Sequence, residues 1–532
     1  MATILQHDKR SGLTYAYESI AYWDKNKKQS RARRTLIGRV NPESGEIEVT
    51  DGRGRRRSIQ TPKTRQWPQL PSRRFYGCTY LLDEIGRNLG LDDDLRCCFP
   101  NSYKQILSIA YYLIMEDASP LFRFEKWHKL HKHPCDNDIS SQRSSELFSS
   151  IDEEARYKFF RLLSKRRAEK EFWVYDTTSI SSYSEQLKQV KRGHNKEHDL
   201  LAQFNLAMVF GEQSMLPFYY RKMSGNMADV TTVKQLVAEL DSLDFIKIKL
   251  VMDRGFYSAL NLSGLYQEHI KFLIATRMSL KFIRRNLESI YDNFRSFEHY
   301  HEGHKVYART VRTTWDYTQE RPYKKDVIES QKRLYIHYYY NITKAAEKEQ
   351  KFDSELNSLR QELLSGKHVE QHQDLYDKYY VVRSTPKRGV KVEVKADVVA
   401  QEKRYMGFFA LLSNEAMTAF EALDIYRNKD LIEKAFGNLK ERLNMRRALV
   451  SSEESLNGKL FVEFIALIYL SELQKRMRGK KMFEQYTLQG VLDELDLIEC
   501  YEVPGKRLQV AEVLKKQTEL YHNLDITPPA SL

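Results

Sequence analysis

The 532-residue sequence is poor in the features that mark several protein classes. It has only five cysteines, at positions 78, 97, 98, 135 and 500, and their spacing suggests neither a disulfide framework nor a zinc site. The longest apolar run, residues 460–470, covers about half of a membrane span and is interrupted by Glu463. The first ten residues lack the apolar stretch of a signal peptide. We therefore expect a cytoplasmic protein with reduced thiols and no membrane partner.

Positive charge is concentrated at the N-terminus. The net charge is +14, and residues 1–75 contribute 17 Lys and Arg against 7 Asp and Glu, a net of +10. A basic segment of this kind favours a polyanionic partner such as nucleic acid. We expect its densest cluster, Arg55, Arg56 and Arg57, to contact DNA.

The residue pattern divides the chain into four regions. Residues 1–72 are basic and β-rich, with a hairpin predicted from 36–40 and 47–49. Residues 73–165 have a helical pattern and form a possible DNA-end-binding domain. Within them, the His-rich stretch 127–135 is interpreted as a solvated basic helix end, since it lacks a second ligand cluster for a metal. A catalytic region at 166–447 precedes a helical C-terminal tail at 448–532.

The catalytic region has the pattern of an α/β fold. Strands are predicted at 172–179, 205–210, 216–223, 246–252 and 272–276, and helices at 229–243 and 257–269, which gives the order β-β-β-α-β-α-β. Residues 278–405 interrupt this order with aromatic strands and an amphipathic helix whose stripe contains Leu356, Leu359 and Leu363. One long helix is predicted from about 414 to 446.

Two acidic residues stand out, one within a predicted strand and one directly after another. Asp176 lies within the aromatic strand 172–179, where an unpaired acid costs desolvation energy. Asp253 directly follows the strand 246–252, and ligands of open α/β sheets bind at the carboxyl ends of strands. A single acid at such a place is usually a loop or cap residue, so the inference depends on the pair sharing a divalent cation.

A third acid, Glu433, lies on a helix face with polar neighbours. Tyr426, Glu433 and Lys440 are seven residues apart and stay on one face of an unbroken helix, and Lys429 flanks the same stripe. A mid-helix glutamate is usually only solvated. In this setting Glu433 can bind a metal while Lys429 and Lys440 neutralise DNA phosphates.

Three carboxylates with nearby cations suit phosphodiester cleavage. Mg²⁺ or Mn²⁺ takes oxygen ligands and leaves positions for water and phosphate. Two such ions activate the attacking oxygen and stabilise the leaving one. We therefore predict that Asp176, Asp253 and Glu433 are catalytic residues and hold two Mg²⁺ or Mn²⁺ ions.

These motifs resemble the DDE transposases of bacterial insertion sequences, in the branch with a Tyr-Arg-Glu-Lys signature. Tyr426, Lys429, Glu433 and Lys440 reproduce the spacing of that signature, with Lys429 in place of the usual arginine. The resemblance extends to four further motifs, Tyr175-Asp176-Thr177-Thr178, Asp253-Arg254-Gly255-Phe256, Gly193-His194-Asn195-Lys196 and Gly225-Asn226 through Asp229.

The resemblance implies a ribonuclease-H-like mixed sheet with helices, split by the insertion at 278–405. It implies hydrolytic nicking at element ends, then strand transfer by the freed 3′-OH, carried out by a homodimer or larger oligomer on the terminal inverted repeats and target DNA of a bacterial nucleoid. Residues expected to contact DNA are Tyr426, Lys429, Lys440, Arg254, His194, Lys196 and the arginines at 55–57. Trp315 in the insertion either stacks on a displaced base or packs in the core.

Two other functions stay open. One is a metal-dependent nuclease on the same fold that does not transpose; inverted repeats flanking the gene would favour the transposase. The other is a non-catalytic DNA-binding protein derived from a transposase, against which the three acids argue, because DNA binding alone needs no metal-holding triad.

Overall fold

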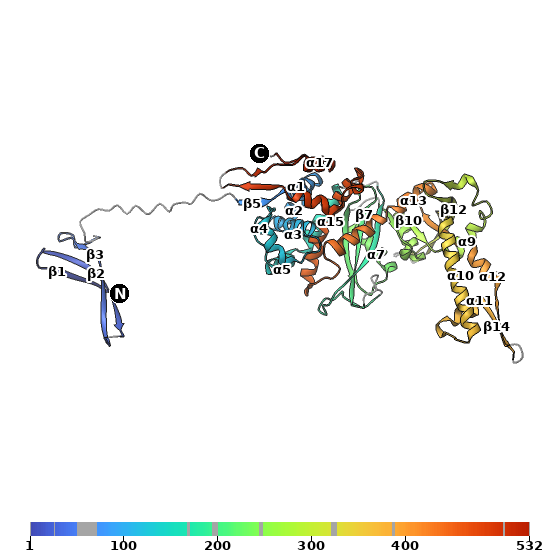
Figure 1. Cartoon of the computed structure of the whole chain (residues 1–532), viewed down its shortest axis with the longest axis horizontal. Helices are drawn as coiled ribbons and strands as arrows, with labels where there is room; N and C mark the ends of the chain where they lie inside the picture. Colours follow the sequence, from blue (N-terminus) through green and yellow to red (C-terminus); the bar gives the residue numbers. More distant parts are fainter. Residues whose placement is uncertain are drawn as a thin grey trace. The chain divides into compact units, whose positions relative to one another are not determined.

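The chain folds into two compact units, Met1–Leu70 and Pro71–Leu532, in a computed structural model that describes residues 2–25, 27–49, 72–166, 171–193, 200–243, 248–320, 327–385, 389–503 and 506–530. The first unit, here called the N-terminal unit, is an antiparallel sheet of β1 (Ala2–Asp8), β2 (Leu13–Asp24), β3 (Gln29–Val40) and β4 (Ile47–Val49) in that order (Figure 1). The predicted hairpin is confirmed, since Val40 pairs with Ile47.

A nine-stranded mixed sheet forms the centre of the second unit. Its order is β11-β12-β13-β16-β10-β9-β6-β7-β8. The first five strands of this region confirm the predicted β-β-β-α-β-α-β order: β6 (Trp173–Ser181), β7 (Gln203–Gly211), β8 (Pro217–Ser224), α7 (Asp229–Ser242), β9 (Lys249–Met252), α8 (Ala259–Gln267) and β10 (Lys271–Thr276). The strands β6, β7 and β8 form an antiparallel meander, and β9 and β10 add in parallel beside β6. The fold class is therefore mixed α/β.

The predicted insertion extends the same sheet on its far side. It comprises α9 (Lys281–Glu288), β11 (Tyr300–His301), β12 (Val306–Glu320), β13 (Val327–Tyr340), α10 (Ile342–Ser365), α11 (Gln373–Tyr379), β14 (Tyr380–Thr385), β15 (Gly389–Val394) and α12 (Ala396–Arg404). The next strand, β16 (Phe408–Ser413), pairs with both β10 and β13 and so joins the two halves. The leucine stripe of α10 is buried against Tyr376 and Tyr379 in a small separate core.

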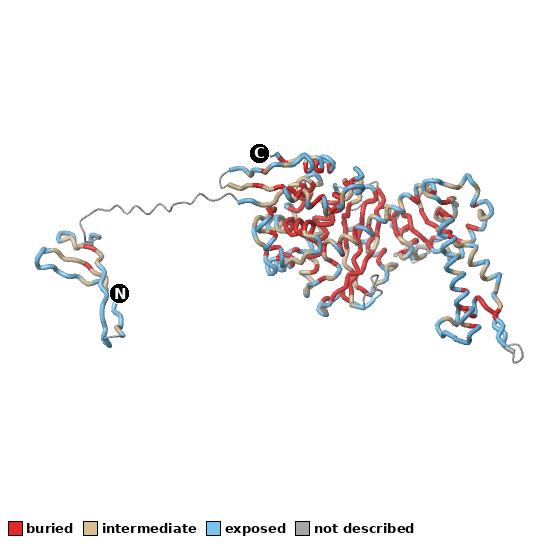
Figure 2. The backbone as a smooth tube through the Cα atoms, in the orientation of Figure 1, coloured by how far each residue is buried: buried red, intermediate tan, exposed pale blue. Residues whose placement is uncertain are grey.

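Helices from both ends of the second unit pack together at the other side of the sheet. The early ones are α1 (Gly77–Leu89), α2 (Leu91–Cys98), α3 (Tyr103–Met115), α4 (Phe124–Leu130), α5 (Ser141–Ser150) and α6 (Glu153–Arg166). The late ones are α15 (Glu453–Gly479), α16 (Leu488–Asp496) and α17 (Lys515–Asn523). The helix α15 packs on α3, α5 and β8, and it is buried almost throughout its middle (Figure 2).

Residues 448–532 are therefore not a peripheral helical tail. They include two strands, β17 (Glu499–Glu502) and β18 (Gln509–Val510), and β17 pairs with β5 (Ser72–Phe75) at the start of the unit. Residues 460–470 are apolar around most of the helix because they are buried within the protein on all sides. In the described part of the chain, no helix is both long and apolar enough to cross a membrane.

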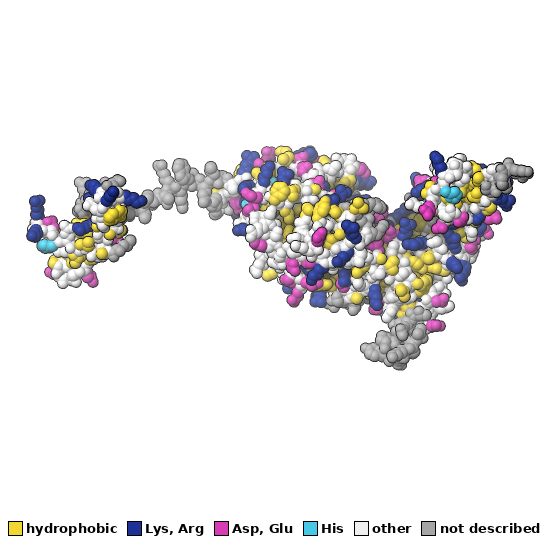
Figure 3. Space-filling view, turned by 90° about the horizontal axis from the view of Figure 1, so that it is seen from below, with side chains coloured by type: hydrophobic (Ala, Val, Ile, Leu, Met, Phe, Trp, Pro, Cys, Tyr) yellow, Lys and Arg dark blue, Asp and Glu magenta, His cyan; other side chains and the backbone are white. Residues whose placement is uncertain are grey.

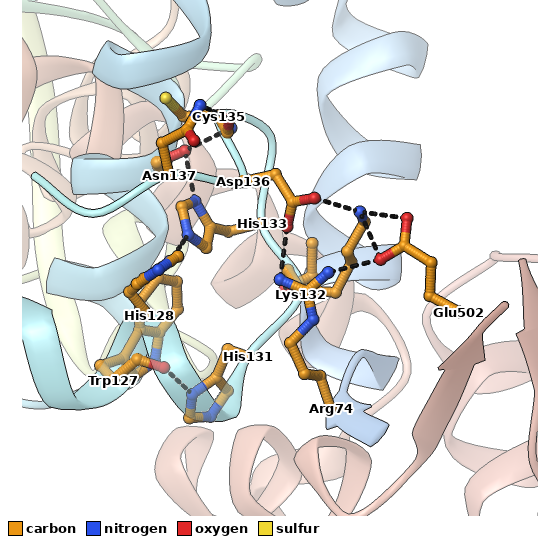
Figure 4. Close-up of polar contacts among 12 residues, drawn as sticks. Arg74, Trp127, His128, His131, Lys132, His133, Cys135, Asp136, Asn137 and Glu502 are labelled. Carbon is orange, nitrogen blue, oxygen red and sulfur yellow. Dashed lines mark hydrogen bonds and ion pairs between the residues drawn. The ribbon is translucent and has the colours of Figure 1, made fainter. Parts of the chain in front are cut away.

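The His-rich stretch differs from the predicted solvated helix end, because His131 and His133 are buried (Figure 4). The Ser108 hydroxyl donates to the carbonyl of Lys104, so it accepts a hydrogen bond from His133 Nδ1 at 2.9 Å. The other ring nitrogen of His133, Nε2, therefore accepts from His128 Nδ1 at 2.8 Å. A proton added to Nε2 would face that donor, and burial together with His128 lowers the pKa of His133 to about 3.

This low pKa predicts a loss of stability in mild acid. Histidine in an unfolded chain has a pKa near 6.5, so below that pH the unfolded state takes up a proton that folded His133 refuses. The loss starts near pH 6.5, continues down to about pH 3, and amounts to at most about 1.4 kcal/mol per pH unit. We expect the melting temperature to fall less between pH 7.5 and 5 for His133→Gln than for the wild type. His522→Gln, at an exposed position, should match the wild type, and equal slopes for all three proteins would contradict the assignment.

Candidate active site

Two parallel strands bring the first two predicted acids together. Strands β6 and β9 pair in the register Val174↔Val251 and Tyr175↔Met252. One further step along this register places Asp176 opposite Asp253. Neighbouring strands lie about 4.8 Å apart and residues in register point to the same face of a sheet. The register therefore places the two acids side by side on adjacent strands.

Asp253 is held in its charged form by three donors. Its Oδ1 accepts hydrogen bonds from the backbone N–H of Arg254 and from the Tyr426 hydroxyl, both at 2.7 Å. Its Oδ2 lies 3.5 Å from the Lys429 ammonium. Burial acts to raise the pKa of Asp253, but the bond from Tyr426 and the other donors outweigh it and lower the pKa below its ordinary value. The carboxylate is consequently ionised at neutral pH.

Glu433 is connected to Asp253 through Lys429. The ammonium of Lys429 lies 3.0 Å from Glu433 Oε1 and thus touches both acids. Burial acts to lower the pKa of Lys429, but Asp253, then Glu433 and Asp176, outweigh it and raise the pKa. The Lys429 ammonium is therefore stabilised by the negative charges of all three acids. The Glu433 side chain is 55% exposed, and its far side remains open to solvent.

Asp176, the third acid of this group, is a partly buried residue within β6. Its Oδ1 accepts a hydrogen bond from the backbone N–H of Thr177 at 2.7 Å. The Thr177 side chain points to the opposite face, where its hydroxyl donates to Asp229 Oδ1 at 2.5 Å at the start of α7. The neighbouring Tyr175 donates to Thr232 on the same helix at 2.9 Å. Strand β6 is thus anchored to α7 on one face and leaves Asp176 on the other.

Asp229 is a positioning residue that the sequence reasoning named only as part of a family landmark. Its Oδ2 lies beside Gly255, where a Cβ atom would be 3.5 Å away. Gly255 belongs to the short 3-10 helix η2 (Arg254–Phe256) that follows Asp253. Asp229 therefore supports the motifs of both strand acids. Its place at the start of a helix, following the Gly225-Asn226 motif, is the sequence signal that could have identified it.

The long helix predicted for residues 414–446 is wrong in its continuity. The structure has α13 (Ala419–Arg427), α14 (Asp430–Gly437) and the π-helical turn η5 (Asn438–Arg442). The chain bends at Asn428, whose side chain donates to Glu212 at 2.5 Å. A seven-residue face requires an unbroken helix. Instead, packing of α13 on β9 brings Tyr426 to Asp253, and packing of α14 on β6 brings Glu433 near them.

The other predicted DNA contacts differ in their surroundings. Arg254 is exposed beside Asp253. Lys440 is only 8% exposed within η5, which favours a packing role in this state. His194, Lys196, Arg55, Arg56 and Arg57 lie outside the described residues. Trp315 is partly buried and packs against the core, with its Nε1 3.4 Å from Ser263 Oγ on α8, rather than being the fully buried residue of the core alternative.

Two glycines among the sequence landmarks have a backbone explanation. A Cβ on Gly193 would lie 2.1 Å from the carbonyl of Gly225, and a Cβ on Gly225 would lie 1.8 Å from the carbonyl of Gln203. Both positions therefore require glycine, because it lets three backbone segments meet at the start of β7.

The donor set suits a hard divalent cation. The three acids offer carboxylate oxygens, the ligands that Mg²⁺ and Mn²⁺ prefer. Within the described ranges, no three His, Cys, Asp or Glu side chains are spaced to hold a metal ion. The acids instead surround the Lys429 ammonium, which provides the positive charge at their centre. Asp176, Asp253 and Glu433 thus match such a cation in charge and ligand type, while in this structure the Lys429 ammonium lies between Asp253 and Glu433.

Comparisons with known proteins identify the family of the chain. A solved structure of a piggyBac transposase synaptic complex with hairpin DNA is similar at 10% identity and a TM-score of 0.35, over 80% of this chain and 75% of that one. The curated proteins include no match. A family model described as a transposase DDE domain matches residues 167–469, which span β6 to α15 and include all three acids. Since this match covers more than half of the sequence, the chain belongs to the family of DDE-domain transposases.

Proposed function

We propose that this protein is the transposase of a bacterial insertion sequence, which cuts the ends of its element and joins the freed 3′-OH to target DNA. The observation that carries the proposal is the pairing of Asp176 and Asp253 on adjacent parallel strands, with Glu433 connected to them through Lys429. The spacing of Tyr426, Lys429, Glu433 and Lys440 supports the Tyr-Arg-Glu-Lys branch of the family.

The sheet topology supports a ribonuclease-H-like catalytic domain. The five strands from β6 to β10 lie in the order third, second, first, fourth, fifth, with the first three antiparallel and the last two parallel to the first. Asp176 lies within β6 and Asp253 directly follows β9, both of them central strands, and the helix α14 that carries Glu433 packs on β6.

Each residue of the site has a distinct part in this proposal. Asp176, Asp253 and Glu433 would hold the divalent cations, which would supply activation of the attacking oxygen and stabilisation of the leaving oxygen. Tyr426 orients Asp253 through its 2.7 Å hydrogen bond. Lys429 and the exposed Arg254 lie at the open side of the acids, where they neutralise phosphates of the bound strand. The partners are double-stranded element ends and target DNA, held by a homodimer or larger oligomer.

The test uses the purified full-length chain and a duplex that ends in the inverted repeat flanking its gene. We expect Mg²⁺ or Mn²⁺ to support cleavage at the repeat end and joining of its 3′-OH to a plasmid, and EDTA to stop both. A duplex with a scrambled repeat is the matched control. Cleavage without joining would support the nuclease alternative, and binding without metal-dependent cleavage would support the non-catalytic one.

A further inference from the structure

The N-terminal unit has almost no core of its own. Among the hydrophobic side chains of residues 2–49, only Ala16 is buried. The two central strands extend past their neighbours, because β1 pairs with β2 only up to Ser19 and β4 pairs with β3 only from Gly38. Residues 20–24 and 29–33 therefore form a two-stranded arm, here called the ribbon (Figure 1). A two-stranded antiparallel segment is at best marginally stable alone in water.

One face of the ribbon combines hydrophobic side chains with arginines. The register pairs Ile20 with Arg33 and Tyr22 with Arg31, so these four side chains share one face. Ile20 is 42% and Tyr22 is 47% exposed. The opposite face carries the small pair Ala21 and Ala32 and then Trp23, which is 63% exposed. Figure 3 shows basic and hydrophobic side chains next to each other on this unit.

The arginines of this face are poorly neutralised by the protein. Arg31 has one acidic neighbour, Asp24, at 3.6 Å. In residues 2–25 and 27–49, Arg33 has no ion pair with an acid. Exposed hydrophobic surface beside weakly neutralised guanidinium groups is typical of an interface with an anionic partner that also has apolar edges.

We propose that the ribbon is a binding site for double-stranded DNA and lies in the major groove with Ile20, Tyr22, Arg31 and Arg33 toward the duplex. The major groove is about 12 Å wide and admits a two-stranded β-ribbon. Five residue pairs at about 3.4 Å each give a ribbon about 17 Å long, enough to follow the groove over several base pairs. Arg31 and Arg33 reach phosphates, and Tyr22 and Ile20 contact sugar and base edges.

Two other partners fit the ribbon less well. An anionic membrane also attracts arginine and aromatic side chains, but the catalytic region belongs to a family whose members act on DNA. If a second copy of this sheet were the partner, its Arg31 and Arg33 side chains would face those of the first copy, and the like charges would repel. The inference rests on the proposed function for the presence of DNA, and it places part of the capture of DNA outside the catalytic region.

The experiment measures binding of the full-length chain to a fluorescently labelled 30-base-pair duplex over a series of salt concentrations. Arg31→Gln/Arg33→Gln should lower the slope of log Kd against log salt by about 1.8, since each lost phosphate contact removes about 0.9. Lys9→Gln/Arg10→Gln removes the same charge from the other end of the sheet and should leave the slope unchanged. All four positions are exposed, so circular dichroism should match the wild type.

A second variant separates apolar contact from charge. Tyr22→Ala should weaken duplex binding roughly fivefold without changing the salt slope, because it removes one aromatic contact and no charge. The ribbon proposal is overturned if Arg31→Gln/Arg33→Gln binds the duplex like the wild type, or if it loses only binding to phosphatidylserine vesicles. It is also overturned if the charge-matched Lys9→Gln/Arg10→Gln lowers the slope equally.

Cleavage distinguishes a failure of the ribbon from a failure of the proposed function. Lys9→Gln/Arg10→Gln should cleave repeat-end DNA at the wild-type rate with Mn²⁺, because it changes neither the acids nor the ribbon, whereas cleavage by Arg31→Gln/Arg33→Gln at limiting protein should fall in step with its loss of duplex affinity. If the wild type itself does not cleave, the proposed function fails while the salt slopes still decide the ribbon. If the wild type cleaves but Arg31→Gln/Arg33→Gln has the duplex affinity and salt slope of the wild type, only the ribbon proposal fails.

Discussion

Replacement of Asp253 by asparagine is expected to lower Mg²⁺-dependent cleavage by more than about 100-fold while DNA binding persists. Mutation of groups that only orient metal ligands costs about 10–100-fold, so the loss of a ligand should exceed that range. The change removes one negative charge but keeps an oxygen that can accept the 2.7 Å hydrogen bond from Tyr426. The variant should therefore fold normally and bind Mn²⁺ more weakly, as measured by calorimetry.

Asp430→Asn is the matched control for this variant. Asp430 is exposed at the start of α14, the helix that carries Glu433, so its replacement removes the same charge near the site without touching the acids. It should cleave and bind Mn²⁺ like the wild type. Wild-type cleavage by Asp253→Asn, together with unchanged Mn²⁺ affinity, would remove Asp253 from the site.

Replacement of Lys429 by methionine is expected to tighten Mn²⁺ binding about tenfold and to slow cleavage at least tenfold. The ammonium contacts two of the acids, at 3.0 and 3.5 Å, and these contacts must break before a divalent cation takes the same oxygens. Charge-assisted hydrogen bonds of this kind contribute about 1.5–3 kcal/mol, and one lost contact of 1.4 kcal/mol corresponds to a factor of ten. The slower cleavage follows because the variant has no cation at this position to neutralise a phosphate.

The opposite directions of these two effects make the prediction specific. Lys434 is exposed on α14, the helix that begins directly after Lys429. Lys434→Met should therefore change neither Mn²⁺ affinity nor the cleavage rate. Lys429→Arg should keep the cleavage rate near that of the wild type, because it restores the charge in the residue type usual for the family. Weaker Mn²⁺ binding by Lys429→Met would show instead that Lys429 arranges the acids for the metal.

The central strands could be predicted because their local pattern agrees with their final environment. The run around Tyr175 is aromatic and β-branched, and it is covered on both faces in the folded sheet. The strand β9 follows the same rule, and its end at Asp253 was located from the sequence. Neither pattern specifies which strands are neighbours, so the register that opposes Asp176 and Asp253 is visible only in the fold.

The helical part of the site could be predicted only in part. The spacing from Tyr426 to Glu433 placed both residues at the site, although the continuous helix assumed for them is broken at Asn428. At the break Asn428 donates a hydrogen bond to Glu212, a residue 216 positions away, and no local pattern contains such a contact. The burial of Lys440 also depends on tertiary packing, because the π-helical turn η5 that contains it packs against α15.

The pairing of β5 with β17 has a consequence for how the protein is made. Arg74 and Glu502, which form an ion pair across this sheet, are 428 positions apart in the chain. At about 5–20 residues per second, a ribosome needs roughly 20–90 s to cover that distance. During this time the N-terminal unit is complete while the first helices of the second unit lack their closing strand. A message cut short before Glu499 therefore yields a chain in which β5 lacks the strand that it pairs with.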